Sequence, residues 1–252
     1  MGRGRHAEAD APCGSMGAVS SPTGGPSLSA AAALGPFFEV SGVPGPGWVT
    51  WAELVHGDPL GQRVAYVAST LAAGPGTPDV DRRIAASLTH LGLTARLLSP
   101  VLGAALLGGV LPVAEPREVY LQLSGANPLP LAMPTARSVR VTDAGELAGA
   151  LDREWLVPAV QPLSVQVTAS TGLSVQVLAG NTVSAVAGAL RMAAAAAPEL
   201  TAVAAATLDA VLAGGSLAGT GRRRDDGGFV RGSCCLLYRL PGAGTCGDCI
   251  LR

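Results

Sequence analysis

The sequence predicts an α+β fold with a predominantly helical body, a small β-sheet and a C-terminal segment rich in cysteine. Apolar residues recur at helical spacing through most of the middle of the chain, and only two short stretches alternate polar with apolar residues. Four of the five cysteines fall within the last nineteen residues. The chain is therefore expected to have a body able to bury a hydrophobic core and a short tail whose reactive groups are cysteine thiols.

The composition is that of a globular protein with little charge. Of the 252 residues, 48% are hydrophobic and 14% are charged, and the formal net charge is −1. A nucleic-acid partner would require a basic excess, so this balance argues against one. Residues 1–29 are rich in Gly, Ser, Pro and Ala and contain no continuous apolar stretch, which predicts a disordered leader without an export signal. We therefore expect a cytoplasmic protein, in which clustered cysteines more often bind metal than form disulfides.

Residues 30–213 are expected to form the body, and its first half is predicted to be helical. Thr50 and Glu53 fit a capping box, in which the two side chains satisfy free N–H groups at a helix start, so a short helix should follow. Apolar spacing predicts further helices over residues 60–72, 79–90 and 93–107. Their expected breaks are the Gly/Pro-rich residues 74–78 and Gly92.

The uncharged stretch at residues 97–114 is long enough to require comparison with a membrane-spanning helix. Its eighteen residues just reach the minimum length, but Pro100, Gly103 and Pro112 interrupt it. We therefore predict a buried helix of a soluble protein. Peripheral contact at the inner face of the cell membrane is the alternative.

The second half of the body mixes the two kinds of structure. Residues 118–124 and 138–142 alternate and predict strands of a small sheet. Asp143 is the predicted cap of a helix through residue 152, whereas residues 155–169 leave helix and strand both open because prolines and β-branched residues weaken the helical pattern. Two alanine-rich helices are predicted over residues 173–197 and 199–212, separated by Pro198.

A metal-binding segment is predicted at the C-terminal end. Residues 214–228 are glycine-rich and charged, which predicts a linker to residues 229–252. There Cys234 and Cys235 are adjacent, ten residues follow, and Cys246 and Cys249 form a C-x2-C pair. Four thiolates from one short segment form the all-sulfur shell that iron–sulfur clusters and structural zinc both use. Neighbouring strand residues face opposite sides, so the adjacent pair can share one centre only if the backbone leaves strand geometry.

Three chemistries compete for this cysteine pattern. Zinc sites usually separate both ligand pairs by two to four residues, and the adjacent pair departs from that spacing. A thiol–disulfide switch would require a βαβ redox fold, which the sequence does not predict. An iron–sulfur cluster is the favoured interpretation. The G-x-G-x-x-G match at residues 242–247 lacks a preceding strand and has no room for a following helix, so it predicts no dinucleotide site.

The tail, FVRGSCCLLYRLPGAGTCGDCILR at residues 229–252, resembles the C-terminal signature of the FhuF-like ferric-siderophore reductases. A weaker similarity is Ala-Gly-Asn at residues 179–181, where the family tends to show Trp-Gly-Asn. In that family a C-C-x10-C-x2-C pattern holds a 2Fe-2S cluster. The resemblance assigns the cluster ligands to Cys234, Cys235, Cys246 and Cys249.

This resemblance implies one-electron reduction of a ferric siderophore in the cytoplasm, with the cluster as the electron relay and a separate electron donor. Ferric iron prefers hard oxygen donors more strongly than ferrous iron does, so one electron loosens the complex and releases the metal. Two alternatives remain open: a siderophore-binding scaffold with a zinc-stapled tail, and an electron carrier that serves another reductase.

Several other residues are candidate contacts of the substrate or the electron donor. Arg231, Arg239 and Arg252 flank the ligands and would offset the negative charge of a cluster or attract an acidic donor, unless they are ordinary surface residues. Tyr238 and Asn181 are further candidates, with plain packing and helix capping as their respective alternatives. We expect His56 and His90 to be surface or helix histidines without a ligand role.

Overall fold

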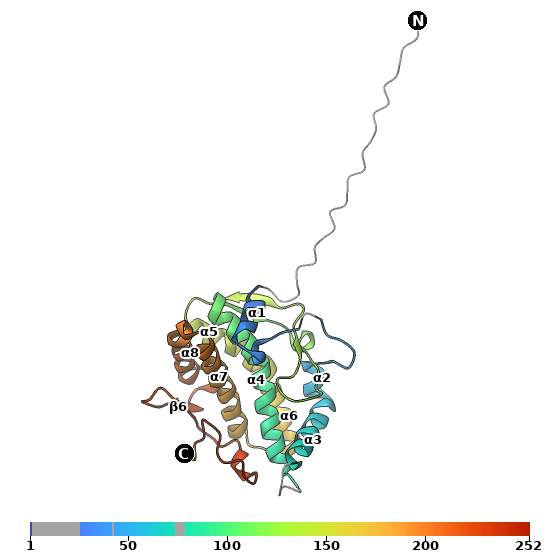
Figure 1. Ribbon diagram of the computed structural model, residues 1–252, viewed down its shortest axis with the longest axis vertical. Coiled ribbons are helices and arrows are strands. Elements are labelled where there is room, and N and C mark those ends of the chain that lie inside the picture. Colours follow the sequence, from blue (N-terminus) through green and yellow to red (C-terminus); the bar gives the residue numbers. More distant parts are fainter. Residues whose placement is uncertain (2–25, 42, 74–78) are drawn as a thin grey trace.

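The fold is α+β, as the sequence predicts, and Figure 1 shows it as a computed structural model that describes Met1 and residues 26–41, 43–73 and 79–252. Most of the predicted leader, Cys13 and the predicted break at residues 74–78 lie outside these residues. The helices are α1 Pro26–Ala31, α2 Trp51–His56, α3 Pro59–Ala72, α4 Arg82–Gly108, α5 Ala144–Leu151, α6 Gln161–Thr171, α7 Val175–Ala196 and α8 Thr201–Ala213.

The described strands form three small antiparallel sheets. One has the order β1-β3-β4, a second pairs β2 with β5, and a third pairs β6 with β7. Their bounds are β1 Val49–Thr50, β2 Val110–Val113, β3 Tyr120–Leu121, β4 Leu131–Ala132, β5 Arg137–Arg140, β6 Gly221–Arg223 and β7 Phe229–Arg231.

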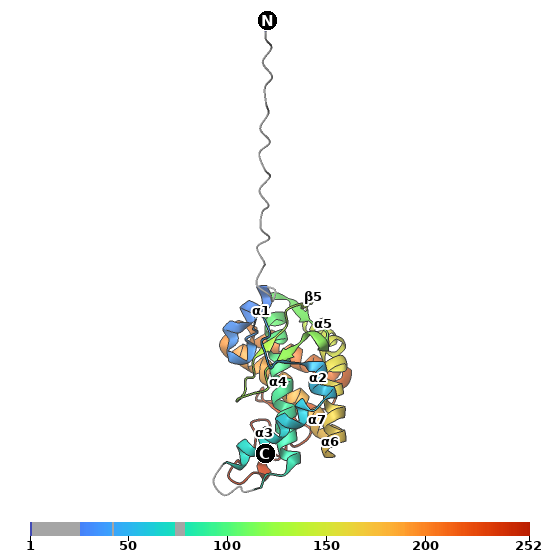
Figure 2. The same cartoon turned by 90° about the vertical axis from the view of Figure 1, so that its right-hand side faces the viewer.

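The two longest helices, α4 and α7, lie at the centre of the body (Figures 1 and 2). They pack along each other, and the largest cluster of buried apolar side chains surrounds them. Length and composition alone would allow either helix to cross a membrane. However, 72% of the apolar window of α4 and 61% of that of α7 are buried within the body. Such burial is what the central helices of a packed domain show.

Helix α4 corrects one prediction. Two helices were expected, with a break at Gly92, but residues 82–108 form a single helix that runs through both Gly92 and Pro100. A Cβ atom at Gly92 would lie only 2.6 Å from the side-chain nitrogen Nδ2 of Asn127. The glycine therefore permits a loop to approach the helix closely and does not end the helix.

Local capping signals locate several helix starts correctly. Thr50 and Glu53 form the predicted capping box, because Thr50 Oγ1 accepts from the Glu53 N–H at 3.1 Å and the Glu53 carboxylate accepts from the Thr50 N–H at 2.7 Å. Asp143 caps α5 by accepting from the Glu146 N–H at 2.8 Å. Each cap depends on residues three positions apart, which explains why sequence alone identifies it.

The strands are shorter than predicted and partly elsewhere. Of residues 118–124, only Tyr120–Leu121 form a strand, because the 3-10 turn Pro116–Glu118 occupies the start of that stretch. The second predicted strand is β5, shifted slightly toward the N-terminus, and its partner β2 lies within the stretch considered above as a membrane helix. Gly109, with φ 62°, ends α4 just before β2.

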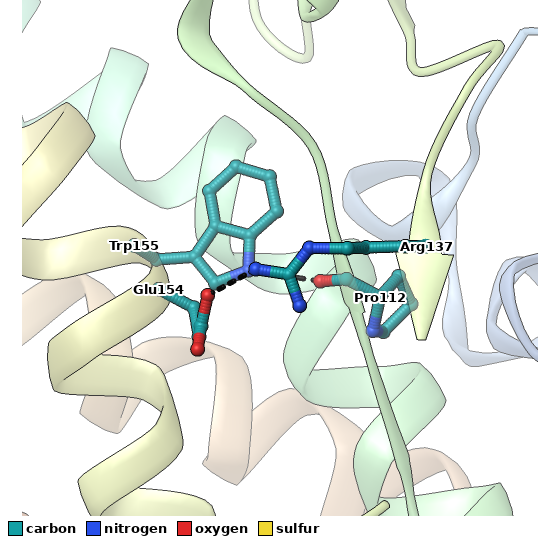
Figure 3. Close-up of polar contacts among 4 residues, drawn as sticks. All are labelled: Pro112, Arg137, Glu154 and Trp155. Carbon is teal, nitrogen blue, oxygen red and sulfur yellow. Dashed lines mark hydrogen bonds and ion pairs between the residues drawn. The ribbon is translucent and has the colours of Figure 1, made fainter. Parts of the chain in front are cut away.

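Residues 155–169, left open from sequence, are helical. A π-helical segment, Asp152–Val160, follows α5 directly and continues into α6. Pro158 lies inside this segment, and having no N–H it breaks the usual helical bonding pattern. Trp155 is fully buried and its indole N–H donates to the carbonyl oxygen of Pro112 at 2.9 Å, while Glu154 pairs with Arg137 at 2.6 Å (Figure 3). These contacts fix the segment against β2 and β5.

The segment predicted as a linker, residues 214–228, contains the 3-10 turn Gly215–Leu217 and strand β6. Strand β6 pairs with β7 in a hairpin, with Gly221 opposite Arg231 and Arg223 opposite Phe229. The hairpin contacts α7 and α8. It therefore holds the start of the tail against the helical body.

Candidate metal centre

The cysteine tail lies against α7 and the first half of α4. Strand β7 ends at Arg231, and the tail, red in Figure 1, continues past the lower part of both helices. Ser233 Oγ donates to the Gln176 carbonyl oxygen at 2.7 Å, and Ser87 Oγ donates to the Cys235 carbonyl oxygen at 2.9 Å. These bonds fix the backbone on both sides of the adjacent cysteine pair.

The backbone leaves strand geometry at the adjacent cysteines, as the pattern requires for both thiols to serve one centre. Leu236 has φ 69°, the only positive φ of a residue other than glycine in the part of the chain that the structure describes. A leucine in that conformation is strained by about 1–2 kcal/mol. Its N–H donates to Cys234 Sγ at 3.3 Å, so the strained turn aims a backbone donor at a candidate ligand sulfur.

The four cysteines differ in burial, and two of their sulfur atoms lie close together. Cys235 and Cys249 are buried, and Cys234 and Cys246 are half-buried. The sulfur atoms of Cys235 and Cys246 lie 3.6 Å apart, close to the ~3.8 Å expected for two thiolates on one tetrahedral metal with metal–sulfur bonds of about 2.3 Å. The Leu251 N–H donates to Cys249 Sγ at 3.4 Å, a second backbone bond to a sulfur.

Taken as they stand, the described residues hold no group of three or more His, Cys, Asp or Glu side chains placed around a single metal ion. A mononuclear site such as structural zinc needs four ligands around one ion. A two-iron cluster instead distributes its four thiolates over two metals, so one close pair of sulfurs is the arrangement of one half of its shell. The close pair Cys235 and Cys246 could therefore hold one metal of such a cluster.

Burial keeps the half-buried thiols protonated when no metal is bound. It is the main cause that raises the pKa of Cys246, followed by the neighbouring Cys235 thiol and the Asp248 carboxylate. Burial also raises the pKa of Cys234, against the opposing effect of the Leu236 N–H. Because metals bind the thiolate, metal binding at this site must release protons.

A buried arginine without a carboxylate partner lies beside the thiols. Arg231 is 1% exposed, and its guanidinium donates to Asn181 Oδ1 and, at 3.3 Å, to the Val177 carbonyl oxygen. Its Nε and Nη1 groups have no hydrogen-bond partner among the described residues. A buried charge is costly unless it is paired. An all-thiolate iron–sulfur cluster is anionic, so it would supply the missing counter-charge.

Asn181 is not a helix cap, which was one of the two roles considered for it. Helix α7 begins after its cap Ser174, and Asn181 lies inside the helix with no exposed surface. Its amide donates to the backbone oxygen of Ser87 at 2.9 Å and to Ser87 Oγ at 3.0 Å, while its own oxygen accepts from Arg231. Asn181 thus links α4 to the arginine, and Ser87, which sequence reasoning missed, extends the link to Cys235.

The remaining candidate contacts lie at the surface of the tail. Tyr238 is 44% exposed, and the Arg239 guanidinium lies 5.9 Å from the centre of its ring. Arg252 Nε donates to Thr245 Oγ1 at 2.9 Å, which fastens the end of the chain to the loop before Cys246. Tyr238 and Arg239 are therefore exposed, whereas the Arg252 side chain is bonded within the tail.

Gly180 is the point of closest approach between α7 and the tail. A Cβ atom at this position would overlap Ser233 Oγ and lie 3.0 Å from Arg231 Nη2. We expect Gly180→Ala to push the tail away, destabilise it by about 1–3 kcal/mol and lower cluster content, as measured by iron per chain and thermal unfolding. Gly188→Ala, on the same helix but with no neighbour within 4 Å of its Cβ, should retain full cluster content. Equal iron content in the two variants would contradict this packing role.

His90 is buried within α4, so the expectation of a helix histidine is correct and that of a surface histidine is not. Burial, with the nearby Arg231 charge, lowers the pKa of His90 from 6.5 to about 3, and its Nε2 lies 2.9 Å from Ser164 Oγ. The unfolded chain therefore binds the proton more readily than the folded chain. The free energy of unfolding should fall by up to ~1.4 kcal/mol for each pH unit between pH 6.5 and pH 3.

Chemical denaturation at several pH values tests this dependence. His90→Gln should show a flatter loss of stability with acidification than the wild type, because it removes the titrating ring. His56→Gln, at the exposed end of α2, should follow the wild type. Parallel curves for wild type and His90→Gln would show that His90 does not set the dependence.

One comparison with known proteins identifies the tail. Residues 231–249 match the family model for the FhuF 2Fe-2S C-terminal domain, and the match contains all four tail cysteines. No protein of curated function matches the chain. The match confirms the resemblance of the tail and the cofactor that the resemblance implies: residues 231–249 are similar to the FhuF 2Fe-2S C-terminal domain.

Proposed function

We propose that the protein is a ferric-siderophore reductase that delivers one electron to siderophore-bound Fe(III) in the cytoplasm and releases Fe(II). The observation that carries the proposal is the FhuF-type 2Fe-2S domain, which supplies one-electron chemistry when its cluster is bound. The ferric siderophore is the substrate and a separate reductant is the electron donor. The near-neutral charge of the chain supports a small-molecule substrate over a nucleic acid.

The cysteines and their neighbours have two tasks in this reaction: to hold the cluster and to favour its uptake of an electron. Cys234, Cys235, Cys246 and Cys249 would hold the cluster. Arg231 places a buried positive charge beside them, which favours the state that has gained an electron. The N–H groups of Leu236 and Leu251, each bonded to a sulfur, act in the same direction because hydrogen bonds to the ligand sulfurs raise the reduction potential. These residues would therefore help the site to accept an electron, which it must do before it can donate one.

Substrate reduction is tested by mixing reduced protein with ferric siderophores. Anaerobic protein reduced with dithionite and freed of excess reductant is mixed with a ferric hydroxamate or a ferric catecholate siderophore. Absorption follows the cluster, and a ferrous-specific chelator traps the product. We expect rapid cluster reoxidation with matching formation of Fe(II), and no reoxidation by the gallium complex of the same siderophore, because gallium(III) accepts no electron. Failure of every ferric siderophore to reoxidise the cluster would favour a carrier that serves another reductase.

A further inference from the structure

A groove of about 530 Å³ adjoins the proposed cluster site, with a volume in the range of small-molecule pockets. Helices α7 and α8 form two of its walls, and the β6–β7 hairpin forms the third. Apolar side chains such as Leu190, Leu208 and Phe229 line it together with polar groups. None of these side chains belongs to the set of cysteine ligands.

The groove reaches the turn that carries two of the candidate ligands. Gly247 and Asp248 line the groove, and they are the two residues between Cys246 and Cys249. The turn is held in place because the Arg231 N–H donates to the Asp248 carbonyl oxygen at 3.1 Å and Ser184 Oγ donates to the Asp248 carboxylate. A molecule in the groove would therefore be separated from the cluster by little more than this turn.

Arginines dominate the charge of the groove lining. Arg191, Arg223 and Arg224 line it, against the single carboxylate of Asp248. Arg191 is exposed, and its side chain forms no hydrogen bond or ion pair with the described residues.

Two further carboxylates lie near these arginines. Arg223 contacts Asp209 at 3.5 Å and Arg224 contacts Asp226 at 3.3 Å, each through Nε alone. Exposed single-contact pairs of this kind are weak, typically about 0–1 kcal/mol. The terminal guanidinium nitrogens of both arginines are therefore available to the oxygen atoms of a ligand.

We infer that this groove binds the ferric substrate, and that it favours iron chelates of net negative charge whose metal is held by oxyanions, such as catecholate or hydroxycarboxylate complexes. The inference rests on the proposed function. Guanidinium forks match oxyanions in shape and charge, and the apolar residues fit the carbon framework of a chelator. In the reaction one electron passes from the reduced cluster to Fe(III), which becomes Fe(II), and the external donor later restores that electron.

Binding of redox-inert gallium chelates tests the groove without relying on turnover. Calorimetry on the cluster-loaded, oxidised protein would use gallium(III) tris-catecholate and neutral gallium(III) tris-hydroxamate as probes. We expect the catecholate complex to bind at least about tenfold more tightly. Gly188→Leu should lower its affinity by about tenfold or more, because Gly188 lines the groove and its Cβ would point into open space. Gly61→Leu, on an exposed face of α3, is the matched control and should bind as the wild type does.

Arginine variants test the charge contribution. Arg191→Gln should weaken binding of the catecholate complex by about three- to tenfold, whereas Arg117→Gln, in the turn before β3, should leave it unchanged. The cluster absorption spectrum confirms that each variant is loaded.

The possible failures can be told apart. Wild-type affinity in Gly188→Leu, or no binding of gallium tris-catecholate to the wild type, would overturn the groove assignment. Equal affinity for the two chelates would overturn the preference for negative charge. Failure of ferric siderophores to reoxidise the reduced cluster would instead overturn the proposed function, which the gallium measurements do not involve.

Discussion

Replacement of any one of the four tail cysteines with serine should abolish or severely reduce cluster binding, the largest effect expected of any single substitution in this protein. Each iron of a 2Fe-2S cluster requires two protein ligands, and a serine hydroxyl at neutral pH is a poor substitute for a thiolate. The residues concerned are Cys234, Cys235, Cys246 and Cys249. Iron and acid-labile sulfide per chain, together with visible absorption, measure the loss.

The same variants should loosen the tail. Small metal-binding segments gain much of their order from the metal, and the apolar anchor of this tail is small: Leu240 packs with Val80 and Ile84, and Leu236 and Leu237 lie against them in part. Hydrogen exchange over residues 232–252 should accelerate in each cysteine variant, while exchange in α4 and α7 should be preserved.

Cys13 provides the matched control, because it is the one cysteine outside the tail. Cys13→Ser should retain wild-type iron, sulfide and absorption. A tail variant that keeps full iron and sulfide content would show that its cysteine is not a ligand, and loss of the cluster in Cys13→Ser would place a ligand in the leader.

Replacement of Arg231 should give the second-largest effect, on both the reduction potential and the retention of the cluster. Reduction adds a negative charge, which the buried guanidinium stabilises, so its removal should lower the potential. An interaction on the order of 1.4 kcal/mol corresponds to about 60 mV for one electron. Arg231→Met keeps the length and apolar stem of the side chain, so the fall in potential in a redox titration reports mainly on the lost charge.

Two further variants separate charge from packing. Arg231→Lys keeps the charge but loses the guanidinium whose Nη2 donates to both Asn181 and Val177, so it should retain most of the potential while losing stability. Arg239→Met removes an exposed charge on the same tail and should shift the potential much less, because water screens it. Equal shifts for Arg231→Met and Arg239→Met would contradict a special role for the buried arginine.

The parts of the fold that sequence predicts correctly depend on local signals. The caps at Thr50 and Asp143 each link residues three positions apart, and the ends of α3, α7 and α8 follow from glycine, proline and apolar spacing. The break expected at Gly92 was wrong because tertiary packing decides there: the glycine makes room for Asn127, thirty-five residues away in the sequence. The short strands depend on pairing between distant segments, so local alternation identifies them poorly.

The candidate site, like the fold, has features that sequence predicts and features that it does not. The four cysteines could be found from sequence because their spacing is local and specific to one kind of chemistry. The contacts that hold the tail could not be found from sequence, because Asn181 bonds to Ser87 across 94 residues and to Arg231 across 50 residues. Sequence made Arg231 a candidate to offset the charge of a cluster, with an ordinary surface arginine as the alternative, and only the packing of β7 against α7 shows that it is buried. Similarly, the groove is formed by two helices and by a hairpin whose first strand, β6, lies in the segment predicted as a linker.

The most direct test of the central claim, that the tail cysteines hold a redox-active 2Fe-2S cluster, is anaerobic purification followed by metal and sulfide analysis and by electron paramagnetic resonance of the dithionite-reduced protein. We expect a coloured protein with about two irons and two acid-labile sulfides per chain and a paramagnetic signal that appears on one-electron reduction. Colourless protein that contains one zinc, no labile sulfide and no signal after reduction would contradict this claim.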